Sequence, residues 1–142
     1  MKRITRRLEF DAGHRVVGHE TKCKNVHGHR YVAEITVEAQ ELDHIGRVID
    51  FGAVKELVGG WIDRYWDHGY IANPDDVILE DIERGGWKVY RMPAGQNPTA
   101  ECMVEELAKR ARELLDLSMV GLTVCHVRLY ETPNCWADWR PS

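Results

Sequence analysis

The feature that most constrains this chain is a histidine-rich stretch at residues 10–31, whose tightest unit is His27-Gly28-His29. In an extended chain, side chains two residues apart point to the same side, so both imidazoles would face one side of a strand. The glycine between them lets neighbouring backbone approach closely, because it carries no side chain. Two such histidines and a third from a nearby strand, such as His14, can hold zinc and leave its fourth position open. The stretch therefore predicts a metal site, although an HxH pair alone also occurs in surface loops.

Alternation of apolar and polar residues places these histidines in a fold. Residues 2–11 alternate as a strand, interrupted at Arg6, and the even-numbered face that carries Phe10 continues to His14. A loop is expected over residues 15–26. A second strand, at about residues 27–41, has His27 and His29 on its apolar face. Both strands are therefore expected to direct their histidines toward one interior.

Composition limits the class of protein. The chain has 142 residues, 44% of them hydrophobic and 30% charged, which is typical of a single globular domain over residues 1–142. The net charge of −4 argues against nucleic-acid binding driven by overall charge. No apolar run reaches membrane-spanning length, the start lacks a signal-peptide pattern, and the four cysteines show no paired spacing. We expect a cytoplasmic protein with reduced cysteines that binds neither membrane nor nucleic acid.

The remaining elements suggest an α+β fold. A helix capped by Asp50 is expected up to about Tyr65, with Gly59-Gly60 marking close packing. A long connection over residues 73–97 contains one extended piece at 87–92. A second helix begins near Thr99, and two strands follow at 122–131 and 135–139. The order predicts a four-stranded antiparallel sheet with two helices on one face.

Three further positions are candidates for chemistry. Cys23 is either a fourth zinc ligand, which would make the metal structural, or a thiolate base favoured by the neighbouring lysines. Asp67-His68 is either a polar helix end or a catalytic pair. Glu131 ends the odd-numbered face of the third strand, after Cys125, Val127 and Leu129, and a carboxylate there needs a partner with N–H donors. A local basic patch for an anionic substrate would come from four residues near the histidines: Arg15, Lys22, Lys24 and Arg30.

Six segments of the chain form a set that spans nearly its whole length: FDAGH at 10–14, CKNVHGHRY at 23–31, VIDF at 48–51, DH at 67–68, NPTAE at 97–101 and YETP at 130–133. Together, and in this order, they resemble the 6-pyruvoyltetrahydropterin synthase and 6-carboxytetrahydropterin synthase family, of the tunnelling-fold group. Each segment alone is a weak signal, but the set is specific.

The resemblance implies a role for each site residue. It implies that His14, His27 and His29 bind zinc, and that Cys23, Asp67 and His68 form the acid/base set. It implies that Glu131 anchors the pterin ring and that Thr99 and Glu101 line the pocket. The substrate would be dihydroneopterin triphosphate.

The three residues between Cys23 and His27 are similar to the bacterial queuosine-pathway branch, which releases 6-carboxytetrahydropterin, acetaldehyde and triphosphate. The alternatives are 6-pyruvoyltetrahydropterin synthesis and a non-catalytic zinc-stabilised binding domain. The resemblance also implies a homo-hexamer, a dimer of trimers in which sheets close into barrels and active sites lie at subunit interfaces. We expect the zinc and Glu131 of one site to come from different chains.

Overall fold

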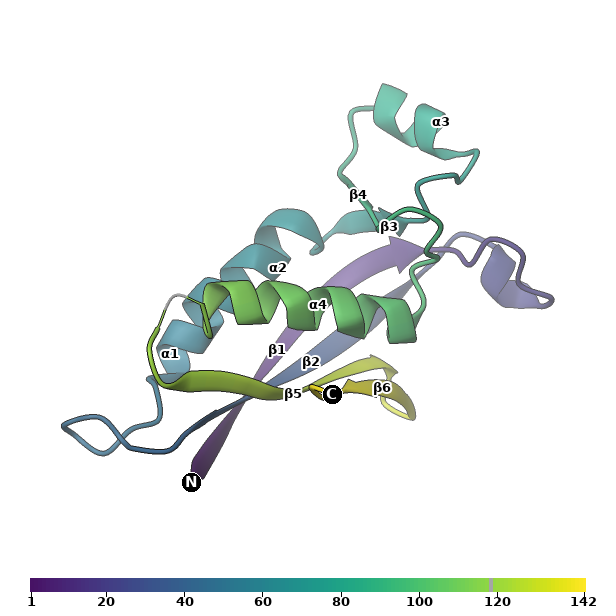
Figure 1. The fold of residues 1–142 in the computed structure, drawn as a ribbon. Coiled ribbons are helices and arrows are strands. Elements are labelled where there is room, and N and C mark those ends of the chain that lie inside the picture. Colours follow the sequence, from purple (N-terminus) through teal and green to yellow (C-terminus); the bar gives the residue numbers. More distant parts are fainter. Residues whose placement is uncertain (118) are drawn as a thin grey trace.

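The computed structural model describes residues 1–117 and 119–142, and in these residues six strands form one sheet in the order β4-β3-β1-β2-β5-β6 (Figure 1). The strands are β1 Lys2–His14, β2 His27–Ala39, β3 Gly69–Ala72, β4 Val89–Arg91, β5 Leu122–Thr132 and β6 Cys135–Trp139. The four predicted strands are β1, β2, β5 and β6, and they pair antiparallel. The architecture is therefore α+β, as predicted.

The predicted strand number was wrong, because β3 and β4 extend the sheet on the far side of β1. Both run parallel to their neighbours, so the sheet is mixed. All four residues of β3 are buried, which removes the period-two alternation that identifies a half-buried strand. Strand β4 has only three residues and lies within the extended piece predicted at 87–92, which was not counted as a strand of the sheet.

The long β1–β2 pair has the predicted register of faces. Phe10 lies opposite Tyr31 and His14 lies opposite His27. The rings of Phe10 and Tyr31 stack with centroids 5.0 Å apart. Directly opposed residues of antiparallel strands share a face, so the histidines lie on the face that carries the buried aromatic residues.

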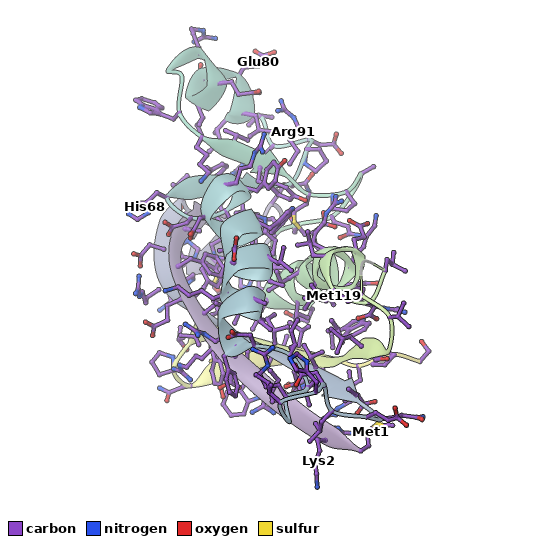
Figure 2. All side chains as sticks on the ribbon, turned by 90° about the vertical axis from the view of Figure 1, so that its left-hand side faces the viewer. Met1, Lys2, His68, Glu80, Arg91 and Met119 are labelled. Carbon is purple, nitrogen blue, oxygen red and sulfur yellow. The ribbon has the colours of Figure 1, made fainter. Side chains whose placement is uncertain are left out.

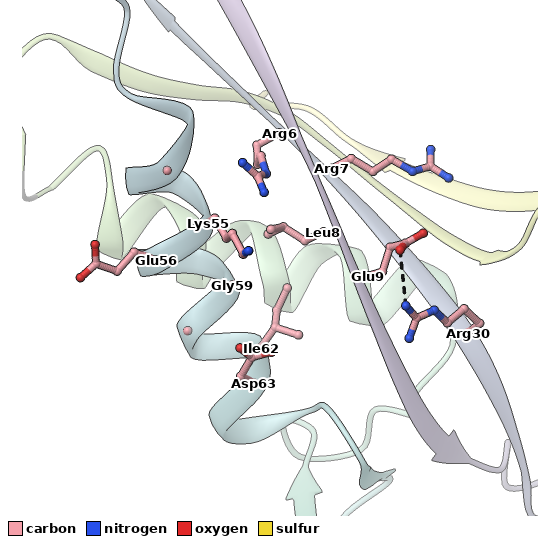
Figure 3. A pocket seen from close by; sticks show the side chains of 12 residues that line it. Arg6, Arg7, Leu8, Glu9, Arg30, Lys55, Glu56, Gly59, Ile62 and Asp63 are labelled. Carbon is pink, nitrogen blue, oxygen red and sulfur yellow. Dashed lines mark hydrogen bonds and ion pairs between the residues drawn. The ribbon is translucent and has the colours of Figure 1, made fainter.

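The first predicted helix is continuous but changes its winding. It comprises α1 Phe51–Val54, a π-helical turn at Lys55–Gly59 and α2 Gly60–Tyr65. The side chain of Asp50 accepts a hydrogen bond from the Gly52 N–H at 2.8 Å, the expected N-cap. This helix crosses close to β1 (Figure 3). A Cβ on Gly59 would lie 3.4 Å from Leu8, whereas Gly60 faces open space, so only Gly59 marks close packing.

The second predicted helix is α4, Ala100–Leu114, with Thr99 as its N-cap. Helices α2 and α4 lie on the same face of the sheet, as predicted (Figure 1). The residues expected to form a bare connection also contain a six-residue helix, α3 Leu79–Arg84, which projects beyond the sheet. This helix packs against a small hydrophobic cluster around Tyr70 and not against the main core. Few of its residues need to be apolar, and its apolar pattern is therefore short. Among the residues described, no helix is long and apolar enough to span a membrane.

One residue of the predicted inward face of β5 was wrong. Its pairing with β2 shifts at a bulge beside Thr36 and Val37, and Val124 is buried in place of the predicted Cys125. A bulge inserts one extra residue and changes which side chains point inward. Beyond it, Val127 and Leu129 are buried as predicted, and the same parity carries Glu131 toward the histidines.

Candidate metal centre and active site

The side chains of His14, His27 and His29 come together where β1 ends and β2 begins. One ligand atom from each lies within 4.8 Å of the others. The ring centroids are 4.6 Å apart for His14 and His27, and 4.8 Å apart for His27 and His29. His14 is buried, and the other two are half-buried. The cluster thus has a buried base and a more open side.

Backbone carbonyls orient two of these rings. Nδ1 of His14 lies 2.7 Å from the Pro98 carbonyl oxygen, and Nδ1 of His27 lies 2.6 Å from that of Asn25. A carbonyl oxygen only accepts, so each Nδ1 carries the proton and each Nε2 presents a lone pair. These two Nε2 atoms lie 3.1 Å apart. Facing lone pairs repel unless a cation lies between them, so the donor set fits zinc.

Burial favours the neutral form of His14 and His29, which metal binding requires. Burial above all, together with the neighbouring His27 and His29, lowers the pKa of His14 to about 4 despite the opposing hydrogen bond to Pro98. Burial also lowers the pKa of His29, although the Glu131 carboxylate opposes this shift.

Glu131 lies beside the histidines of its own chain. Its Oε1 is 3.3 Å from Nε2 of His14 and 3.6 Å from Nε2 of His29. One chain thus brings the carboxylate and the histidines together without a second copy, whereas they were expected to come from different chains. The β1–β2 and β2–β5 pairings bring the three strand segments side by side.

Asp67 and His68 form a second group with Asp11. One Asp67 oxygen lies 2.9 Å from Nδ1 of His68, and the other accepts from the Asp11 N–H at 3.0 Å. The His68 N–H donates to the Asp11 carbonyl at 2.6 Å and holds His68 at a φ of 58°. This left-handed conformation is uncommon outside glycine, and such residues often occur at functional sites. Burial raises the pKa of Asp67, but the hydrogen bonds from Asp11 and His68 outweigh it and leave this pKa below its ordinary value.

This second group faces away from the histidine cluster. Asp11 belongs to the odd-numbered face of β1, whereas His14 belongs to the even-numbered face. The His68 side chain is 77% exposed and points outward from the molecule (Figure 2). It borders an open hollow of about 510 Å³ that Asp11, Arg30 and His29 also line. His68 is not one of the three histidines whose ligand atoms converge in this chain.

Cys23, Thr99 and Glu101 lie on the segments that flank the cluster. Cys23 is half-buried in a short 3₁₀ turn, Lys22–Lys24, and does not belong to the group of three histidines. The Thr99 hydroxyl accepts from the Cys102 N–H at 3.2 Å as the cap of α4. Glu101 is exposed in the first turn of that helix. Because Pro98 contacts His14, this helix end lies next to the cluster.

Asp11 and the two carbonyls that orient the rings were not predicted from the sequence. Backbone acceptors leave no trace in residue type, and Asp11 was one of two acidic residues, with Glu9, on the polar face of the first strand. The predicted basic patch is also smaller than expected. Arg15 is paired with Asp76, and Arg30 is paired with Asp11 and Glu9. Lys22 and Lys24 stay exposed beside Cys23.

Comparison with known proteins gives one consistent match. The family model described as 6-pyruvoyl tetrahydropterin synthase matches residues 3–142. A 6-carboxy-5,6,7,8-tetrahydropterin synthase of Rickettsia felis is 44% identical over 142 residues, covering 97% of this chain and 99% of the relative. One of Aquifex aeolicus is 32% identical and covers 96% of each chain. An uncharacterized Wolinella succinogenes protein has a TM-score of 0.82 at 21% identity, covering 99% and 98% of the two chains. The Plasmodium falciparum 6-pyruvoyl tetrahydropterin synthase has a TM-score of 0.74 at 19% identity and covers 99% of each.

Proposed function

The chain belongs to the 6-pyruvoyl tetrahydropterin synthase family, and we propose that it is a zinc-dependent 6-carboxytetrahydropterin synthase. The reaction would convert dihydroneopterin triphosphate and one water molecule to 6-carboxytetrahydropterin, acetaldehyde and triphosphate, as a cytoplasmic step of 7-deazaguanine and queuosine biosynthesis. The observation that carries the proposal is the convergence of the His14 and His27 Nε2 atoms beside the Glu131 carboxylate. The names of the Rickettsia relatives support the choice of product.

His14, His27 and His29 would hold the zinc. Three neutral imidazoles leave its charge undiminished, so it would act as a Lewis acid toward the hydroxyl oxygens of the substrate side chain. The Pro98 and Asn25 carbonyls fix the rings of His14 and His27, which is the usual task of second-sphere acceptors. A set of three ligands is typical of a catalytic site, which argues against the zinc-stabilised binding domain.

Glu131 would bind the pterin ring. A pterin presents an amino group and a ring N–H side by side, and one carboxylate can accept from both. The Glu131 side chain is 28% exposed at the open side of the cluster, so it remains accessible to a ligand. Thr99 and Glu101, on the adjoining helix end, would line the same pocket.

Cys23 and the Asp67-His68 pair would move protons. In this mechanism the Cys23 thiolate removes a proton from the substrate side chain, and His68 transfers one on the opposite side. The 2.9 Å contact with Asp67 fixes the orientation of the His68 ring. A carbon–carbon bond of the substrate side chain would then break with uptake of one water molecule, and acetaldehyde and triphosphate would be released.

The exposed position of His68 supports an oligomer with shared sites. The cluster of one chain would meet the Asp67-His68 pair of another in a homo-hexamer formed as a dimer of trimers. Each pocket would then contain the zinc ligands and Glu131 of one subunit and the acid/base pair of its neighbour.

Product analysis tests the proposal. Purified protein would be loaded with zinc, incubated with dihydroneopterin triphosphate, and its products identified by mass spectrometry. We expect 6-carboxytetrahydropterin with acetaldehyde in equal amounts. Formation of 6-pyruvoyltetrahydropterin would assign the alternative activity, and absence of turnover with zinc bound would support the binding domain instead.

A further inference from the structure

Arg15 follows His14, and its guanidinium donates hydrogen bonds to two segments that are separate in the sequence. Nε lies 2.9 Å from one Asp76 oxygen and Nη2 lies 2.8 Å from the other. Nη1 donates to the Lys24 carbonyl at 3.2 Å. This forked geometry suits arginine, because its donors are held in a rigid plane. Arg15 therefore ties the turn that carries Cys23 to the connection between β3 and β4.

Asp76 provides a rigid anchor for that arginine. Its carboxylate is fully buried and also accepts from the Tyr70 hydroxyl at 2.9 Å and from the Ile78 N–H at 3.1 Å. Burial raises the pKa of Asp76, but the hydrogen bonds from Arg15, Ile78 and Tyr70 prevail and hold this pKa below its ordinary value. A buried carboxylate with this many donors has little freedom to move.

The next two residues of the chain continue the attachment. The Val16 N–H donates to the Cys23 carbonyl at 2.8 Å. Val17 makes two hydrogen bonds with the Asn97 side chain, at 3.0 and 2.9 Å. Asn97 in turn accepts from Asn73 at 3.1 Å and precedes Pro98, whose carbonyl orients His14. Residues 15–17 thus join the Cys23 turn, the segment at 73–98 and the metal cluster.

We propose that Arg15 is a positioning residue, which fixes the Cys23 turn relative to the histidine cluster by its grip on Asp76 and the Lys24 carbonyl. The proposal rests on the proposed function, in which Cys23 moves a proton. The proposal also gives the connection between β3 and β4 a role, because this connection holds the Asp76 carboxylate that binds Arg15. A displacement of about 1 Å at a reacting group can cost roughly 10²-fold in rate, so a loose turn would lower turnover without releasing substrate or metal.

The test compares Arg15→Lys and Asp76→Asn with a matched control, Arg47→Lys. Lysine keeps the charge but lacks the fork, so it cannot serve Asp76 and the Lys24 carbonyl together. Arg47 donates to Asp43 at 2.8 Å, and Asp43 likewise accepts from backbone N–H groups, but this pair lies in the turn that follows β2. The readouts are kcat, KM, zinc content, and hydrogen exchange at the amides of Val16, Lys24 and Asn25.

In Arg15→Lys we expect kcat to fall about 10- to 100-fold, with KM changed less than about threefold and zinc content unchanged. Exchange at the three amides should rise at least about tenfold, because their hydrogen bonds open more often. Arg47→Lys should change neither kcat nor the exchange rates of these three amides. Unchanged exchange and kcat in Arg15→Lys would overturn the proposal, as would a loss of kcat that only follows a loss of zinc or of folded protein.

If Arg15→Lys does not fold, Asp76→Asn provides the test. It should also lower kcat and raise amide exchange, with KM and zinc content nearly unchanged. Failure of the proposed function is recognised separately. If Cys23→Ala turns over at the normal rate, Cys23 has no acid/base role and that part of the proposed function fails. The hydrogen-exchange measurement on Arg15→Lys still shows independently whether Arg15 fixes the turn.

Discussion

The Glu131 carboxylate lies 3.3 Å from Nε2 of His14 within a single chain. Strand β2 separates β1 and β5 in the sheet, so this contact forms across it at the end where the histidines lie. It places the carboxylate that we propose binds the pterin ring beside the proposed metal ligands. His68 points away from the same cluster, and this division of residues determines the predictions below.

The first prediction concerns the metal. We expect about one zinc per chain in purified protein, and less than about a tenth of that in His27→Ala and in His29→Ala, because either change removes one of three ligands. The measurement is elemental analysis after dialysis against a weak chelator. His44→Ala, an exposed histidine in the turn after β2, is the control and should keep its zinc. Full zinc in both ligand variants would refute the assignment.

The second prediction concerns proton transfer. Cys23→Ala and His68→Ala should keep the fold and the zinc but lose about 10²–10⁴-fold in kcat, the usual contribution of general acid–base catalysis. Cys135→Ala changes an exposed cysteine of β6 and should be fully active. A near-normal rate in either test variant removes that residue from the mechanism.

The third prediction concerns Glu131. Glu131→Gln keeps the size of the side chain but replaces one acceptor oxygen with a donor, so a paired N–H group of the pterin loses its partner. Hydrogen bonds to charged groups are worth about 1.5–3 kcal/mol, so we expect kcat/KM to fall about 10- to 150-fold with zinc retained. Glu34→Gln, which loses a surface pair with Arg7, is the control. A kcat/KM within about twofold of normal would exclude Glu131 from substrate binding.

The fourth prediction concerns shared sites. His27→Ala and Glu131→Ala affect the same chain's pocket, so mixing these two inactive proteins under subunit exchange should restore nothing. Mixing His27→Ala with His68→Ala should restore up to about a quarter of the activity, since that share of interfaces combines two intact halves. Analytical ultracentrifugation checks that a hexamer forms and exchanges. Recovery in the first mixture, or none in the second despite exchange, would contradict this division.

The fifth prediction concerns acid stability. The pKa of Asp76 is lowered in the folded chain, so its ionised form contributes stability above the ordinary carboxyl pKa of 3.8, and this contribution is lost as pH falls through the folded value. Breaking a buried ion pair typically costs about 3 kcal/mol or more. Urea unfolding of wild type and Asp76→Asn should therefore differ by about that much at pH 7, and the difference should shrink below pH 3.8. A difference independent of pH would show that the Asp76 charge is not stabilising.

The sequence alone determined the direction of the key side chains. Alternation along β1 and β2 placed His14, His27 and His29 on one inward face, and Glu131 followed from the parity of β5. Each of these predictions depends only on the two-residue period of an extended backbone, which is a local property. The N-cap at Asp50 was predictable for the same reason, since its acceptor bonds a neighbouring N–H.

Only the tertiary structure decided which distant groups meet. The added strands β3 and β4, the bulge beside Cys125, the attachment of Arg15 to Asp76 and the outward direction of His68 have no local signature. Asp75 and Asp76 are adjacent in the sequence, and the folded chain buries Asp76 against Arg15 and Tyr70 while Asp75 stays exposed. Such contacts depend on where the whole chain closes its loops, and their energy exists only after the sheet has assembled.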